Sequence, residues 1–134
     1  MEHQRKLVHV THMPIRWGDM DAYGHVNNTV YFRYMEQARV EWIEALGVQV
    51  RPGGDGPVII NTGCTFLKPM HYPGTVEVRT YVDPPGRSSV QSHVDMLIDG
   101  ELVAEGAAKI VWMNTQSGKS VPIPDHLREM LDAE

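Results

Sequence analysis

Cysteine is almost absent from this chain of 134 residues, since Cys64 is the only one. A single cysteine excludes an internal disulfide framework, a Cys-x-x-Cys redox pair and an all-cysteine metal site. We interpret Cys64 as a small core residue rather than a nucleophile, because no neighbouring residue in the sequence marks it as activated. This favours a reducing compartment, and we expect a cytoplasmic location.

Long apolar runs and positive charge are also scarce. No stretch approaches the roughly 20 apolar residues of a membrane-spanning helix, and no apolar run long enough for a signal peptide follows the N-terminus. The 12 Lys and Arg residues against 17 Asp and Glu give a formal net charge of −5. A duplex-DNA-binding protein needs a basic face, so we expect neither nucleic acid nor a membrane as a partner.

The composition does provide for a folded core. Apolar residues make up 42% of the chain and charged residues 22%, which is typical of a soluble globular protein. The length is just under that of one typical domain, and the sequence has no internal repeat or low-complexity tract. We therefore expect a single domain over residues 1–134.

Residues 28–46 have the most regular apolar pattern in the chain. Apolar side chains at this spacing fall on one face of an α-helix. Asn27, Asn28 or Thr29 can cap the start of this helix with a short polar side chain, and Gly47 can end it in the left-handed conformation. The positions that define the face are Tyr31, Met35, Ala38, Trp42 and Leu46.

Elsewhere the apolar period is two, which indicates half-buried strands. Residues 51–57 are rich in Gly and Pro and are expected to form a loop. Asp99-Gly100 predicts a type I′ hairpin turn, and Pro124 can open a short last helix over residues 125–131. The expected strands are residues 7–17, 58–68, 75–83, 88–99 and 101–114.

These elements predict an α+β fold with a five-stranded antiparallel sheet, because short connections favour antiparallel pairing. One long helix is well sized to cover one face of such a sheet. We expect the opposite face to remain half apolar. A sheet with a second apolar face usually hides it in an oligomer, so the pattern predicts at least a dimer.

Residues 16–28 gather side chains that carry chemistry. The segment holds two carboxylates, one imidazole, two amides and two glycines directly before the predicted helix. Gly18 and Gly24 let the backbone approach a ligand or take positive φ, and a helix start offers unpaired N–H groups to an anion. A carboxylate beside such an oxyanion site provides the parts needed for acyl transfer. The plainer interpretation is an aspartate that only caps the helix.

The same segment partly resembles two kinds of metal site, a calcium loop and a zinc site. It begins like an EF-hand loop at residues 19–24, but its fifth position is Tyr23 and its twelfth lacks the required Glu. A zinc site built from Asp19, Asp21 and His25 lacks the usual spacing frame. Neither calcium nor zinc is therefore expected.

The ordered motif of residues 19–28, followed by Tyr31 and the long amphipathic helix, resembles the hotdog-fold thioesterases of the 4-hydroxybenzoyl-CoA thioesterase-like group. The match continues through residues 65–69 and residues 122–124, so it spans nearly the whole chain. The resemblance implies a sheet wrapped around the helix, with active sites at a dimer interface and pairing of dimers into tetramers in many members. The expected activity is hydrolysis of an acyl-CoA to a carboxylic acid and free CoA, without cofactor or metal.

The resemblance also implies roles for individual residues. Asp21 matches the catalytic carboxylate, as either nucleophile or general base, and the backbone N–H of Asn28 falls where the thioester carbonyl is polarised. Gly24 matches a loop glycine that keeps the turn open, and Tyr31 matches a recurring aromatic on the first helical turn. His25 is placed with the substrate-binding residues, without a proton-transfer role.

Further substrate contacts are expected away from this loop. Arg87 and Ser88 are candidates for the CoA phosphates, because related enzymes often carry basic residues near this strand start. Asn61 and Thr62 are polar residues in an otherwise apolar strand and can orient water or substrate. The plainer alternatives are a solvated surface charge and ordinary sheet hydrogen bonding. Other basic candidates are Arg51, Lys68 and Lys119.

Two other functions fit parts of the pattern. Hotdog hydratases or dehydratases use an Asp and a His five residues apart, whereas His25 here lies six residues after Asp19 and four after Asp21. A non-catalytic acyl-CoA-binding module could use the same fold, although the presence of Asp21 weighs against it. Both CoA and an acyl-carrier protein remain open as the carrier of the acyl group.

Overall fold

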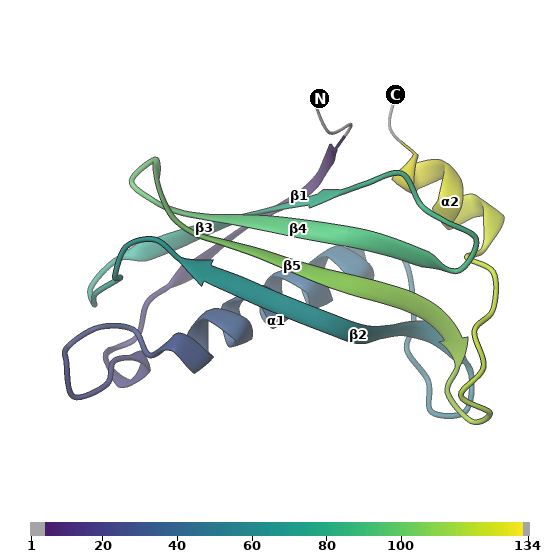
Figure 1. Ribbon diagram of the computed structural model, residues 1–134, viewed down its shortest axis with the longest axis horizontal. Helices are drawn as coiled ribbons and strands as arrows, with labels where there is room; N and C mark the ends of the chain where they lie inside the picture. Colours follow the sequence, from purple (N-terminus) through teal and green to yellow (C-terminus); the bar gives the residue numbers. More distant parts are fainter. Residues whose placement is uncertain (1–4, 133–134) are drawn as a thin grey trace.

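A five-stranded antiparallel sheet curves over one long helix (Figure 1). The computed structural model describes residues 5–132, and its strands run in the order β1-β3-β4-β5-β2. The predicted α+β class, with one long helix and a short C-terminal helix, is therefore confirmed. The elements are β1 (Lys6–Pro14), α1 (Asn28–Ala45), β2 (Asp55–Phe66), β3 (Thr75–Val82), β4 (Ser89–Ile98), β5 (Glu101–Asn114) and α2 (Asp125–Leu131).

Two predicted element boundaries differ from the structure. β2 begins at Asp55, inside the segment expected to be a loop, and Pro57 stands opposite Trp112 of β5. Proline is tolerated there because β2 is an edge strand with only one neighbour, so no second ladder needs its missing N–H. β1 ends earlier than expected, because residues 17–19 form a 3₁₀ turn.

The start and end of α1 follow from local chemistry. The Asn27 side chain caps the helix by accepting a hydrogen bond of 2.9 Å from the Thr29 N–H. Gly47 follows the last turn with a φ of 82°, the left-handed conformation expected there. The face that α1 buries is Tyr31, Tyr34, Met35, Ala38 and Trp42, so Tyr34 joins the predicted set, whereas Leu46 is only half-buried.

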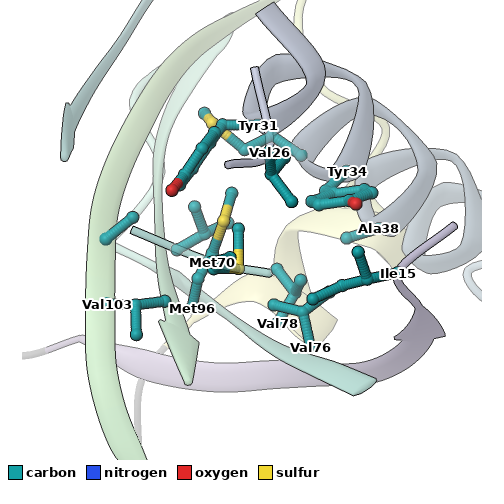
Figure 2. Packing of buried hydrophobic residues seen from close by; sticks show 13 residues of the cluster. Ile15, Val26, Tyr31, Tyr34, Ala38, Met70, Val76, Val78, Met96 and Val103 are labelled. Carbon is teal, nitrogen blue, oxygen red and sulfur yellow. The ribbon is translucent and has the colours of Figure 1, made fainter. Parts of the chain in front are cut away.

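The core lies between α1 and the concave face of the sheet. Figure 2 shows Tyr34 and Ala38 of α1 beside Ile15, with Met70 and Met96 filling the space toward the strands. A second cluster surrounds Trp42 and is closed by α2. α1 therefore contributes to both clusters, and α2 covers only the second one.

The outward face of the sheet carries polar and apolar side chains together, since Leu7 and Val10 of β1 stand opposite the outward Tyr81 and Arg79 of β3 and are 49% and 40% exposed. Along β3 the valines point to the helix, so the residues between them point outward. Arg79 stands opposite Asp95 of β4 in the register, and Tyr81 stands opposite His93. This mixture of side chains agrees with the expectation of a second, half-apolar face.

The edge of the sheet at β2 is more exposed than its face. Within residues 5–132, β2 pairs only with β5, and its middle carries Ile60 at 53% exposure next to the exposed Asn61, Thr62 and Gly63. A long unpaired edge with an apolar side chain is a template for pairing with another strand.

The described part of the chain has no helix with the length and hydropathy to cross a membrane.

Candidate active site

The loop between β1 and α1 is closed by its own backbone hydrogen bonds. The Asp21 N–H donates to the His25 carbonyl over 2.9 Å, and the Gly24 N–H donates to the Asp21 carbonyl over 2.9 Å. The Asn27 N–H donates to the Asp19 carbonyl over 3.0 Å, directly before the helix. Gly24 takes a φ of 76°, which a residue with a side chain would adopt only under strain. The loop therefore presents Asp21 beside the start of α1.

Asp19 is held by the fold and turned away from this surface. Its carboxylate is buried, at 8% exposure, and accepts hydrogen bonds from the Tyr34 hydroxyl (2.7 Å) and the Arg16 N–H (3.0 Å). Burial acts to raise the pKa of Asp19, but these hydrogen bonds and the nearby Arg16 guanidinium outweigh it and hold the pKa below its ordinary value. Asp19 is therefore an anchor of the loop.

Asp21 is oriented without being paired to a cation. One carboxylate oxygen accepts from the Tyr23 N–H over 3.0 Å, and the other accepts from the Asn27 side-chain amide over 3.2 Å. Among residues 5–132 no Lys, Arg or His forms a salt bridge with Asp21. Each oxygen keeps acceptor capacity, so the side chain is available to a substrate or a water molecule.

Asp21 lines an open cleft of about 350 Å³ at the N-terminal end of α1. Four predicted site residues meet there, since His25, Asn28 and Tyr31 line the same cleft as Asp21. The opposite wall comes from the end of β2 and the segment after it. It is made by Phe66, Leu67, Lys68 and Pro69.

Asn28 lines this cleft as the first residue of α1. Its backbone N–H has no acceptor within the helix. The next two amides are already used, because the Thr29 N–H donates to the Asn27 side chain and the Val30 N–H donates to the Asn27 carbonyl. Among residues 5–132 the Asn28 N–H has no hydrogen-bond acceptor, and the helix dipole adds positive potential at this point.

Tyr31 shapes the wall of the cleft. Its ring meets Phe66 edge to face, with centroids 4.8 Å apart and planes at 89°. Its hydroxyl donates to the Lys68 carbonyl over 3.4 Å, and burial raises the pKa of Tyr31. Tyr31 is thus a packing residue that joins α1 to the end of β2, and it remains neutral at ordinary pH.

The remaining predicted contacts do not reach this cleft in their own chain. Asn61 and Thr62 lie on the exposed middle of β2, where the Thr62 hydroxyl donates to the Ala107 carbonyl over 3.0 Å. Arg87 and Ser88 lie in the connection from β3 to β4, beside α2 and far from the start of α1 (Figure 1). The Arg87 carbonyl accepts from the Ile123 N–H over 2.9 Å. This bond holds the connection beside α2, at the end of the molecule away from the Asp21 cleft (Figure 1).

Sequence reasoning missed two residues that shape the loop. Asn27 was considered only as a helix cap, yet its amide also holds Asp21. His71 lies 47 residues from Gly24 in the chain and contacts the Gly24 carbonyl, and no spacing pattern connects the two. Across residues 5–132, no three His, Cys, Asp or Glu side chains are grouped so that they could hold a metal ion.

The chain belongs to the thioesterase-like superfamily, whose family model matches residues 15–131. This match covers the loop, both helices and all strands except β1. The predicted membership of the hotdog thioesterases and the predicted class of enzyme, a thioester hydrolase, are thereby confirmed.

Individual proteins show how far the similarity extends. The solved structure of the PA2801 protein from Pseudomonas aeruginosa is 42% identical and superimposes with a TM-score of 0.87, covering 92% of this chain and 98% of that one. The YsmA protein of Bacillus subtilis (strain 168) is 30% identical over 121 residues, which are 87% of this chain and 80% of YsmA. The long-chain acyl-CoA thioesterase FadM of Escherichia coli (strain K12) is 23% identical over 133 residues, covering 91% of this chain and 96% of FadM.

Proposed function

We propose that this protein hydrolyses an acyl-CoA to a carboxylic acid and free CoA at the Asp21 cleft. One observation carries the proposal: Asp21 and Asn28 line the same cleft. The cleft thus brings together a carboxylate without a salt bridge among residues 5–132 and the residue that supplies the first amide of a helix. This pairing of an acceptor with an oxyanion donor is what acyl transfer requires.

Two routes use the same groups. In the first, an Asp21 oxygen attacks the thioester carbon, the carbonyl oxygen gains charge against the Asn28 N–H, and the C–S bond breaks to release the thiolate. Water then cleaves the mixed anhydride. In the second, Asp21 takes a proton from a water molecule whose oxygen attacks the carbon directly. A single turnover in H₂¹⁸O that leaves the label in the Asp21 carboxyl identifies the first route.

Substitution of Asp21 tests the proposal. We expect Asp21→Asn to lower kcat by at least about 100-fold, because the amide can neither attack nor accept the proton. The measurement is thiol release from a panel of short, long and aromatic acyl-CoA esters and the matching acyl-carrier-protein esters. Asp125→Asn, at the exposed start of α2, is the matched control and should retain full activity.

A second variant tests the Asn28 backbone N–H as the oxyanion donor. Asn28→Pro removes only the backbone N–H at the first helical position, where proline is well tolerated, and Asn27 already has the extended backbone that precedes a proline (φ −64°, ψ 144°). We expect a loss of about 10²–10³ in kcat with little change in stability. Asn28→Ala keeps the N–H and should remain active.

The alternatives have distinct outcomes in the same assays. Equally slow thiol release by the wild type and Asp21→Asn across the whole panel would overturn the proposal. Loss of enoyl-CoA absorbance without thiol release would indicate a hydratase. Calorimetric binding of acyl-CoA without turnover in either assay would indicate a binding module.

We further propose that the functional form is a homo-oligomer, a dimer or a dimer of dimers, joined through β2. The acyl group would then lie between copies, along α1 and β2. A cavity of about 750 Å³ supports this, since its apolar lining comes from the second half of α1 and the start of β2, including Val40, Ile43 and Ile59. Arg87, Ser88, Asn61 and Thr62 would serve a substrate held by another copy. A cytoplasmic location stays a prediction.

A further inference from the structure

The segment between β2 and β3 packs directly against the Asp21 loop. The Val26 N–H donates to the Met70 carbonyl over 2.8 Å, and the side chains of both residues are buried, at 4% and 1% exposure. Two residues further on, the Tyr72 N–H contacts the Met20 sulfur at 3.5 Å. The loop therefore rests on this segment on both sides of Asp21.

His71 stands between these two contacts and reaches the tip of the loop. Its Nδ1 lies 3.1 Å from the Gly24 carbonyl oxygen. A carbonyl oxygen only accepts, so Nδ1 carries the proton in this contact. The His71 ring also meets the His25 ring edge to face, with centroids 4.8 Å apart and planes at 72°. One side chain thus contacts two successive residues of the loop.

Both contacted residues form backbone hydrogen bonds with Asp21. The Gly24 N–H donates to the Asp21 carbonyl, and the His25 carbonyl accepts from the Asp21 N–H.

We propose that His71 is a positioning residue, whose Nδ1–H holds the Gly24 carbonyl and whose ring supports His25, so that Asp21 and the free Asn28 amide face the same cleft. The inference rests on the proposed function of that cleft. His71 does not line the cleft itself and acts only through the loop.

Three variants test the role of His71. His71→Ala removes both contacts, whereas His71→Asn keeps an N–H donor the same number of bonds from Cα. His126→Ala is the matched control, because His126 is exposed on α2 at the other end of the molecule. We expect His71→Ala to lower kcat by roughly 10- to 100-fold with KM changed by less than about twofold. His71→Asn should recover most of this loss, and His126→Ala should match the wild type.

Backbone amide hydrogen exchange gives a readout that needs no turnover. In His71→Ala the hydrogen-bonded amides of Asp21 and Gly24 should exchange at least about tenfold faster, while amides in the middle of α1 stay unchanged, and His71→Asn should restore the slower rates. If the wild type releases no thiol from any ester, the proposed function fails. The amide exchange rates of the loop in His71→Ala then show by themselves whether His71 holds the loop. An unchanged loop in His71→Ala, or faster exchange with an unchanged kcat in an active enzyme, overturns the inference.

Discussion

Asp19 and Asp21 are separated by one residue, yet their carboxylates have opposite surroundings. Asp19 is enclosed by Tyr34 and Arg16, whereas Asp21 meets only neutral donors at the rim of a cleft. The Tyr34 phenol stays protonated and donates its hydrogen to Asp19, because burial and the adjacent Asp19 raise its pKa well above the usual range. One carboxylate therefore stabilises the loop and leaves the other available for chemistry.

The pH dependence of stability should report on Asp19. Because its folded pKa lies below the ordinary value of 3.8, its stabilising contribution is complete above that value and is lost as pH falls through the folded pKa. We expect Asp19→Asn to lower the free energy of unfolding by about 1–3 kcal/mol at pH 7, measured by urea denaturation. The difference from the wild type should shrink below about pH 3.8, and a difference that stays constant down to pH 2 would contradict this assignment.

At the residue scale, sequence reasoning reached the cleft but not the residues that position it. The order of the loop motif and the start of α1 identified Asp21, His25, Asn28 and Tyr31, which do line one cleft. These residues are close in the chain, so a local pattern can group them. His71 comes from a distant segment and meets the loop only because β3 pairs with β1, which composition and spacing do not encode.

At the scale of elements, the packing of the Met35 side chain of α1 on β5 depends on Gly106. A Cβ at this position would lie 2.8 Å from the Met35 sulfur and 3.0 Å from a Val94 methyl. The helix can pack this tightly on the sheet because the strand has no side chain at that point. The predicted strand over residues 101–114 was correct, but alternation alone gives no reason for a glycine at its centre.

Gly106→Ala should therefore overpack the core. We expect a loss of about 1–3 kcal/mol in the free energy of unfolding, measured by urea denaturation, with the midpoint shifted and the slope retained. The end of Met35 is flexible, so Met35→Ala should provide room, and the double variant should lose less than the sum of the two single variants. Strict additivity would show that the two positions do not interact.

The ends of strands were less predictable than their existence. β2 extends back to Asp55 because the edge of the sheet accepts Pro57, whereas a composition rule treats every Gly and Pro cluster as a break. The hairpin at Asp99-Gly100 was predictable because both residues need positive φ, and they have values of 50° and 80°. Local rules succeed where the backbone itself is constrained and fail where the position of the strand in the sheet decides.

At the scale of the whole molecule, the open edge of β2 predicts how copies associate. Its apolar side chain Ile60 is 53% exposed, and a charged residue at an edge is a known obstacle to strand pairing. We expect the wild type to sediment as a dimer or tetramer, and Ile60→Lys to shift it to the monomer in sedimentation velocity. Leu7→Lys, on the opposite edge strand β1 with 49% exposure, should leave the assembly unchanged.

Activity should follow this change in assembly. If Arg87 and Ser88 serve a substrate in another copy, the Ile60→Lys monomer should bind acyl-CoA more weakly and show a higher KM, while Leu7→Lys keeps the wild-type value. A fully active monomer would contradict the proposed role of a second copy.

The single helix α1 lines both the proposed active-site cleft and the cavity of about 750 Å³. Val40 lies 12 residues beyond Asn28 in α1, which corresponds to about 18 Å along the axis. Substitutions at Val40 or Ile43 would therefore reshape the space offered to a hydrocarbon tail without disturbing the oxyanion donor. In this arrangement, substrate preference can change by substitution of a few aliphatic side chains while the proposed catalytic residues Asp21 and Asn28 stay the same.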